Sequence, residues 1–327
     1  MKRWTAVWLA LAMTVSAGAA AARADEVELR AKKVSDAPAL DGRVDKAWDA
    51  VKATRITASE GPQGNVVITA KALYTDKEIF FLFQWPDKTM SMNRFFEFDG
   101  KEWKKVKGYE DRFNLAWDIR NTIKEFPAKG CTGLCHKEGK QVSFKTNGPS
   151  ERVDIWHWKA QRSNPVGYMD DQWLGSDAIK SMYEGREVVR YRGNDKATSG
   201  AGKNNWDKEA KRPKYGWKNG SKPGPVLLEK DAVEIKDHGR FKAGDRLPLE
   251  TLARPGGSRG EIDAKGVWAN GRWTLEVKRA RATEDKENDV QFTDEARPYL
   301  FGISVHDDAT DDEHSTTERN VLKLLLK

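Results

Sequence analysis

The sequence predicts an all-β protein, an antiparallel β-sandwich with long loop insertions. Several segments alternate apolar and polar residues with the period of a strand, among them residues 65–74 and 112–119. An Asn-Gly pair at 270–271 separates two further strand patterns, which is the strongest short signal of a β-hairpin. Helical periodicity is scarce along the whole chain.

The remaining strands follow from shorter patterns. Residues 78–85 are almost continuously apolar, which is typical of a buried central strand, and a short link makes them a hairpin with residues 65–74. Three further segments have the pattern of a strand, namely residues 153–160, 299–305 and 321–326. Near the start of the domain, Trp48 follows an Asp-Gly turn and is expected to anchor its segment in the core.

Composition limits the class of protein. Hydrophobic residues make up 38% and charged residues 33% of the 327 residues, but 13 tryptophans supply enough apolar area for a packed core. The net charge is +7, with lysine and arginine interspersed among acids rather than gathered in one stretch. We therefore expect no nucleic-acid partner.

The first 24 residues read as a signal peptide that is removed on export. Lys2 and Arg3 form a basic start, residues 7–22 are apolar, and 22–24 offer a small-x-small cleavage site. The alternative is an uncleaved membrane anchor. No later segment approaches the ~20 apolar residues of a membrane span. The expected location is therefore the periplasm, with no transmembrane segment in the mature chain.

The mature chain, residues 25–327, is expected to form one domain with two insertions. Regular patterns stop at about 121–151, where both cysteines lie, and again at about 170–225. The second insertion is long for a bare loop, and its scattered aromatic residues favour partial order.

The chemistry of the sequence is concentrated in Cys131, Cys135 and His136. Covalent attachment of haem c needs two thiols and a histidine directly after the second, usually as C-x-x-C-H. Here one extra residue separates the cysteines, and Gly130 and Gly133 give the backbone freedom to accommodate it. The sequence predicts one covalent haem c with His136 as an iron ligand. A Cys131–Cys135 disulfide with an incidental histidine, or a metal site with further ligands, stays open.

A second iron ligand is expected across the haem. His157 is the leading candidate because it follows the cysteines closely and lies between Trp156 and Trp158, which could wall the haem. Met92 is the fallback, although packing is its ordinary role. For every candidate, a place in the core or at the surface is the alternative. Other candidates are Met90, His238, His306 and His314, of which the last two stand among acids and are expected to be solvated.

These residues, together with several flanking motifs, resemble a known family. The motifs are Leu40-Asp41-Gly42 with Trp48, and the segments 109–113, 146–149, 154–160 and 162–168. Over most of the mature chain they are similar to the haem-binding domain of the gamma subunit of ethylbenzene dehydrogenase and related periplasmic c-type cytochromes. The resemblance implies a sandwich related to DOMON and carbohydrate-binding modules.

The resemblance also implies a role in electron transfer. The partner would be a periplasmic oxidoreductase or a membrane or soluble cytochrome. The gamma subunits hold haem b without a covalent link, between methionine and lysine. This sequence departs from them by its cysteines, so Met92 and Lys159 are retained only as fallback ligands.

We find no acid-base pair, activated nucleophile or phosphate loop, so a non-catalytic redox protein is expected. The alternative is a non-redox, extracytoplasmic ligand-binding module of carbohydrate type with a Cys131–Cys135 disulfide.

Overall fold

The computed structural model describes most of the chain after the predicted signal peptide. Residues 1–24 lie outside the described part, so the predicted cleavage site is not placed. No helix among the described residues has the length and apolar character to cross a membrane. The described ranges are 25–61, 64–138, 141–176, 179–183, 186–190, 192–193, 201–218, 224–309, 313–317 and 320–327.

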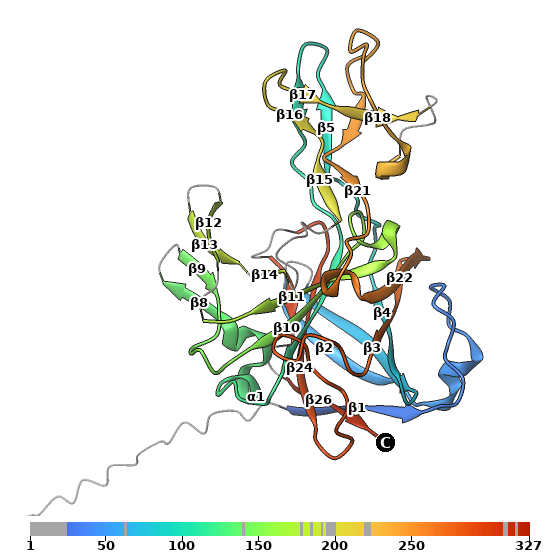
Figure 1. The fold of residues 1–327 in the computed structure, drawn as a ribbon, viewed down its shortest axis with the longest axis vertical. Coiled ribbons are helices and arrows are strands. Elements are labelled where there is room, and N and C mark those ends of the chain that lie inside the picture. The colour runs from blue at the N-terminus through green and yellow to red at the C-terminus, as the bar shows by residue number, and fades with distance from the viewer. Residues whose placement is uncertain are drawn as a thin grey trace, which may run out of the picture.

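A single sheet of 13 strands forms the body of the protein (Figure 1). The strand of residues 112–118, at one end of the sheet, also pairs with the strand of residues 299–306 near the other end, so the sheet closes on itself. Across the sheet the strands are β1 (Asp25–Lys33), β26 (Asn320–Leu326), β24 (Tyr299–His306), β25 (Ser315–Thr316), β2 (Thr54–Gly61), β3 (Gly64–Tyr74), β4 (Glu78–Pro86), β23 (Arg272–Ala280), β22 (Ile262–Ala269), β11 (Tyr168–Leu174), β10 (Val153–Lys159) and β7 (Arg112–Asp118), with β14 (Arg192–Gly193) beside β11.

The sheet folds into two layers that pack through aromatic side chains. Phe81 of β4 contacts Trp117 of β7 and Trp156 of β10, with ring centroids 5.7 and 5.9 Å apart. Trp85 of β4 meets Trp158 of β10 edge-on at 6.1 Å. These contacts belong to the largest buried apolar cluster, which we call the main core. The predicted all-β sandwich is confirmed.

One detail differs from the prediction of an antiparallel sandwich. Strand β1 pairs in parallel with both of its neighbours, β26 and β3. The predicted hairpin at 270–271 is present, and Asn270 and Gly271 have φ values of 52° and 72°, as a type I′ turn requires. Trp48 is buried as predicted, in the short 3-10 helix η1 (Lys46–Ala50), and donates to Glu276 Oε1 at 3.0 Å.

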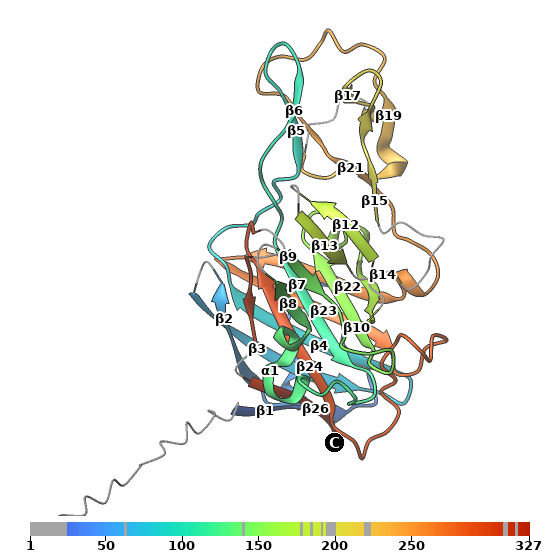
Figure 2. The same ribbon diagram turned by 90° about the vertical axis from the view of Figure 1, so that its left-hand side faces the viewer.

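The first insertion contains the cysteines and forms part of a second, smaller sheet. It comprises α1 (Phe126–Lys129), the 3-10 helix η2 (Gly130–Leu134), β8 (Cys135–Glu138) and β9 (Gln141–Phe144). Strands β12 (Ile179–Tyr183) and β13 (Arg186–Arg190) extend β8 and β9 into a four-stranded sheet. Figures 1 and 2 together place this sheet beside the β10–β11 layer of the body.

The second insertion has different boundaries from those predicted. Residues 170–174 belong to β11 in the main sheet, while the excursion continues past 225 to about 252. The described residues of the range 201–252, together with the separate segment 95–105, form a projection at the top of Figure 1, which has its own apolar cluster around Phe96 and Trp103. The projection contains β5 (Phe95–Phe98), β6 (Trp103–Lys105), β15 (Gly202–Asn204), β16 (Trp206–Asp207), β17 (Arg212–Pro213), β18 (Tyr215–Trp217), β19 (Ala232–Glu234), β20 (Arg246–Pro248) and β21 (Glu250–Leu252).

We expect a Gly266→Ala substitution to destabilise the sandwich. A Cβ at this position of β22 would lie 2.3 Å from Cζ2 of the buried Trp158 ring. Displacing that ring within a close-packed core should lower the free energy of unfolding by about 1–3 kcal/mol, measured by urea denaturation. Gly148→Ala is the control, since nothing lies within 4 Å of its added Cβ. Equal losses in the two variants would contradict this packing argument.

Candidate cofactor site

The cysteine motif lies on a loop that packs against the body. Its backbone forms η2 and the start of β8, where Cys135 pairs with Phe144 and His136 with Ser143. Leu134 is fully buried in a second apolar cluster, against which Phe144 also packs. Cys135 is exposed. The side chains of Cys131 and His136 lie outside the described part of the structure, so only the backbone places them.

The second apolar cluster occupies the face of β10 that points away from the main core. All seven residues of β10 are buried, because the strand is covered on both sides. Trp156 and Trp158 point into the main core, whereas Val153 and Ile155 belong to the second cluster. The period of a strand places His157 on the same face as Ile155. His157 therefore lies on the face against which the cysteine loop packs.

Strand register extends this face into a row of polar side chains. His157 is opposite Asp170 of β11 and Asn114 of β7, and Asn114 is opposite Ser304 of β24. The Asn114 amide donates to Ser304 Oγ at 3.0 Å. We call these four residues the polar row. Beside the polar row, Lys159 is the next residue on this face of β10, and it is opposite Arg112 of β7.

Burial and neighbouring charge keep His157 neutral. Its side chain is 3% exposed. Burial lowers the pKa of His157 well below its usual value, and the charges of Lys159 and Arg112 lower it further. At neutral pH its imidazole is therefore uncharged, which is the form in which histidine binds a metal.

A buried ion pair crosses from β10 to β11 beside His157. The Lys159 ammonium contacts Asp170, which also accepts from Tyr168 Oη at 2.8 Å and from Arg259 Nε at 3.2 Å. Burial raises the pKa of Asp170, but Lys159 and Arg259 outweigh it and hold the value at about 2. Burial lowers the pKa of Lys159 to about 8, against the opposing effect of Asp170. Both groups are charged at neutral pH.

The turn after β10 is held by a second buried acid. Glu110 accepts from the backbone amides of Gln161 and Arg162 at 2.9 Å each, and its carboxylate contacts the Arg162 guanidinium. Arg94 lies 3.8 Å from the same carboxylate and also contacts Glu250 of the projection. This network fixes the end of β10 that holds Lys159.

The structure corrects the roles predicted for two tryptophans. Trp156 and Trp158 do not lie beside His157; they occupy the opposite face of β10 and pack in the main core. The reason is the alternation of side chains along a strand, which separates neighbouring residues. Met92 packs against the main core as well, and not against the second cluster. The apolar residues on the face of His157 are instead Ile155, Leu134 and the other members of the second cluster.

Two further histidines near this face, His306 and His314, are less exposed than the sequence predicts. His306 was expected to be solvated but is 4% exposed, and it stacks on the half-buried His314 with ring centroids 4.6 Å apart. Its Nε2 lies 3.1 Å from the Asn114 amide nitrogen, at the edge of the polar row. The signal was the period of β24, which places His306 on the same face as Ser304. Met90 is exposed, and His238 lies in the projection beside Phe241.

The donor set on this face fits a haem ligated by nitrogen. The imidazole of His157 is neutral and buried, and an apolar cluster lies on the same face of β10. Haem ligation by histidine requires that neutral form, and a porphyrin needs apolar walls. The residues present would therefore accept the group that the cysteine motif indicates.

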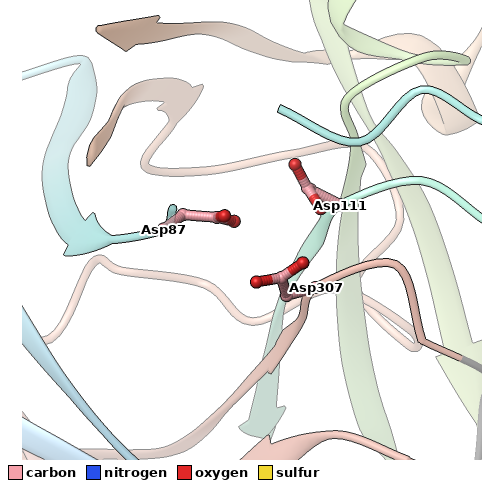
Figure 3. A group of neighbouring side chains, drawn as sticks. All are labelled: Asp87, Asp111 and Asp307. Carbon is pink, nitrogen blue, oxygen red and sulfur yellow. The ribbon is translucent and has the colours of Figure 1, made fainter. Parts of the chain in front are cut away.

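A separate group of acids lies at one end of the sandwich. Asp87 follows β4, Asp111 precedes β7 and Asp307 follows β24, and Figure 3 shows their carboxyl groups converging. Burial, followed by Asp307, raises the pKa of Asp87 to about 7, and burial, followed by Asp87, raises that of Asp111 to about 8. Backbone amides of Thr89 and Ser91 donate to Asp87 and Asp111 at 3.0 and 2.7 Å. This group therefore has donors of its own.

Fold and site together define an all-β sandwich protein with a buried polar face beside a cysteine-bearing loop. The chain belongs to the ethylbenzene dehydrogenase family, whose model matches residues 45–319. A comparison with curated proteins finds no match.

Among solved structures, the chain is similar to carbohydrate-binding proteins. A family 9 carbohydrate-binding module from Caldicellulosiruptor kristjanssonii in complex with glucose is 10% identical, with 91% of this chain and 95% of that chain covered and a TM-score of 0.36. A candidate carbohydrate-binding protein from Bacteroides uniformis is 8% identical, with 92% and 99% covered and a TM-score of 0.39. At these values the likeness says nothing of a ligand.

We expect Asp170→Asn to destabilise the protein by about 3–5 kcal/mol at pH 7, because it leaves Lys159 charged and buried without its carboxylate. The penalty should shrink as the pH rises. The substitution lowers the folded-state pKa of Lys159 below its present value of about 8, while the unfolded value stays near 10.5. Above about pH 8 the lysine is neutral in both folded proteins, and this part of the penalty disappears.

Urea denaturation at about pH 6, 7, 8 and 9 measures this dependence. Asp263→Asn is the control, because Asp263 pairs with Arg254 at 2.5 Å where both side chains are partly exposed. Its effect should stay below about 1 kcal/mol at every pH. A penalty for Asp170→Asn that is the same from pH 6 to pH 9 would show that Lys159 is not its cause.

Proposed function

We propose that this chain is a periplasmic, monohaem c-type cytochrome that transfers electrons. It would act free or as a non-catalytic subunit or partner of an oxidoreductase. The observation that supports it best is the shared face: the loop of Cys131, Cys135 and His136 packs against the same side of β10 as the neutral, buried His157. Membership of the ethylbenzene dehydrogenase family is consistent with a redox role.

Each residue would have a distinct task. The thiols of Cys131 and Cys135 would hold the porphyrin covalently, and His136 would supply one axial nitrogen. His157 would supply the second nitrogen through its neutral imidazole. Leu134 and Ile155, which are buried together, would keep water from this face. When bound, the haem supplies a one-electron couple.

The charged residues beside His157 would shift the midpoint potential of the haem. Lys159 and Arg112 lie on the same face and already lower the pKa of His157. Positive charge disfavours the more oxidised, more positive state, so these residues would raise the midpoint potential. Asp170 opposes this effect at Lys159, since its carboxylate is ionised.

The first test is maturation. The full chain, expressed with a c-type cytochrome maturation system, should bear one haem per chain on the peptide that contains Cys131 and Cys135. Haem staining after denaturing electrophoresis and peptide mass spectrometry measure this. A mature protein without haem, in which Cys131 and Cys135 form a disulfide, would reject the proposal and support the non-redox binding module.

The second test concerns the distal ligand. We expect His157→Met to keep a low-spin, six-coordinate spectrum and to raise the midpoint potential, since a thioether replaces a nitrogen ligand. His157→Ala should lose the low-spin spectrum of the oxidised protein. His238→Ala in the projection is the control and should change neither property. An unchanged spectrum and potential in both His157 variants would exclude His157 as the ligand.

A further inference from the structure

A second group of acids lies inside the sandwich, away from the proposed cofactor site. Asp154 of β10, Asp171 of β11 and Asp289 of the segment between β23 and β24 each offer a carboxylate oxygen, and these atoms lie within 4.8 Å of one another. All three side chains are fully buried. Two consecutive strands and a segment more than 100 residues later therefore bring their carboxylates together in the protein interior.

An arginine acts on this group of acids. The Arg279 guanidinium is fully buried beside the group and lies 2.9 Å from Asp154 Oδ2. Glu261, which directly precedes β22, adds a fourth acid that acts on Asp171. Burial raises the pKa of Asp154 to about 7 and that of Asp171 well above its usual value, and Arg279 only partly opposes this. Arg279 therefore offsets only part of the cost of burying these two carboxylates.

Two buried carboxylate oxygens of the group have no hydrogen-bond partner among the described residues. Asp154 Oδ2 accepts from Arg279 Nη1 at 2.9 Å and from the Val290 amide at 3.0 Å. Its other oxygen, Oδ1, is inaccessible to solvent and has no such partner, and the same holds for Oε1 of Glu261. Buried carboxylate oxygens are normally satisfied, and a bound cation would satisfy these two.

We propose that Asp154, Asp171 and Asp289, with Glu261 at the entrance, bind a calcium ion. The donors are carboxylate oxygens only, which favours a hard cation over zinc or copper. Calcium accepts six to eight oxygens in flexible geometry, whereas magnesium keeps several waters and seldom occupies an all-protein cage. Glu261 is half-buried, so it connects the group to the surface and offers a route for the ion.

The ion would join the segment that contains Asp289 to the two neighbouring strands β10 and β11. Asp154 and Asp171 come from neighbouring strands, and Asp289 precedes Val290 and Phe292, which are buried in the main core. The segment of Asp289 is ordered by Asp285, whose Oδ1 accepts from the amides of Glu287 and Asn288. Calcium binding would therefore fix this segment against β10 and β11.

The experiment uses the full mature chain after treatment with a chelator. Isothermal titration with Ca²⁺ should show one site per chain, and about 5 mM Ca²⁺ should raise the melting temperature by about 5 °C. Magnesium at the same concentration should give a smaller shift. Neither heat of binding nor a calcium-dependent shift in the wild-type protein would overturn the proposal, whatever the variants do.

Two variants assign the site. Asp289→Asn should lose the calcium response, while its metal-free form should melt no lower than the metal-free wild type, because one repulsive charge is gone. Asp307→Asn neutralises an acid of the other group and should keep the full response. Loss of the response in Asp307→Asn with its retention in Asp289→Asn would move calcium to the Asp87 group and reject this assignment.

Discussion

The complete burial of β10 on both faces is the constraint from which the rest of the structure follows. A strand with water on neither side cannot leave a polar side chain to solvent, so each one must meet a partner on a neighbouring strand. On the outer face, Lys159 meets Asp170 and His157 adjoins Asn114. On the inner face, Asp154 meets Arg279. The polar residues of β10 therefore define both candidate sites.

The aromatic core gives the outer face its rigidity. Trp156 and Trp158 pack against Phe81, Trp85 and Trp273 on the opposite layer, with ring centroids between 4.9 and 6.1 Å apart. Rings packed this closely cannot shift without displacing their neighbours. The backbone of β10 is thereby fixed, and His157 with it. The two tryptophans thus position His157, the proposed iron ligand, by packing on the opposite face of β10; they do not form walls for the haem.

The sequence allowed the strands with apolar alternation to be predicted, but not the polar strand β11. The segment 170–172 is polar and therefore resembles a loop, because nothing local shows that Lys159 and Arg259 pair with Asp170 or that Arg279 acts on Asp171. The error about Trp156 and Trp158 was avoidable, since strand period alone separates them from His157. The burial of His306 was harder to foresee, because it depends on pairing with β7, which is almost 200 residues away.

The buried carboxylates on the two faces of β10 have different neighbours, and this difference bears on what each face can bind. On the outer face Lys159 and Arg259 surround one carboxylate, so the chain supplies its own balance. On the inner face one arginine serves several carboxylates, and an oxygen of Asp154 is left without a donor. A buried group of carboxylates of this kind is suited to an ion taken from outside. Stability of the strand that holds His157 would then depend on a metal bound on its opposite face.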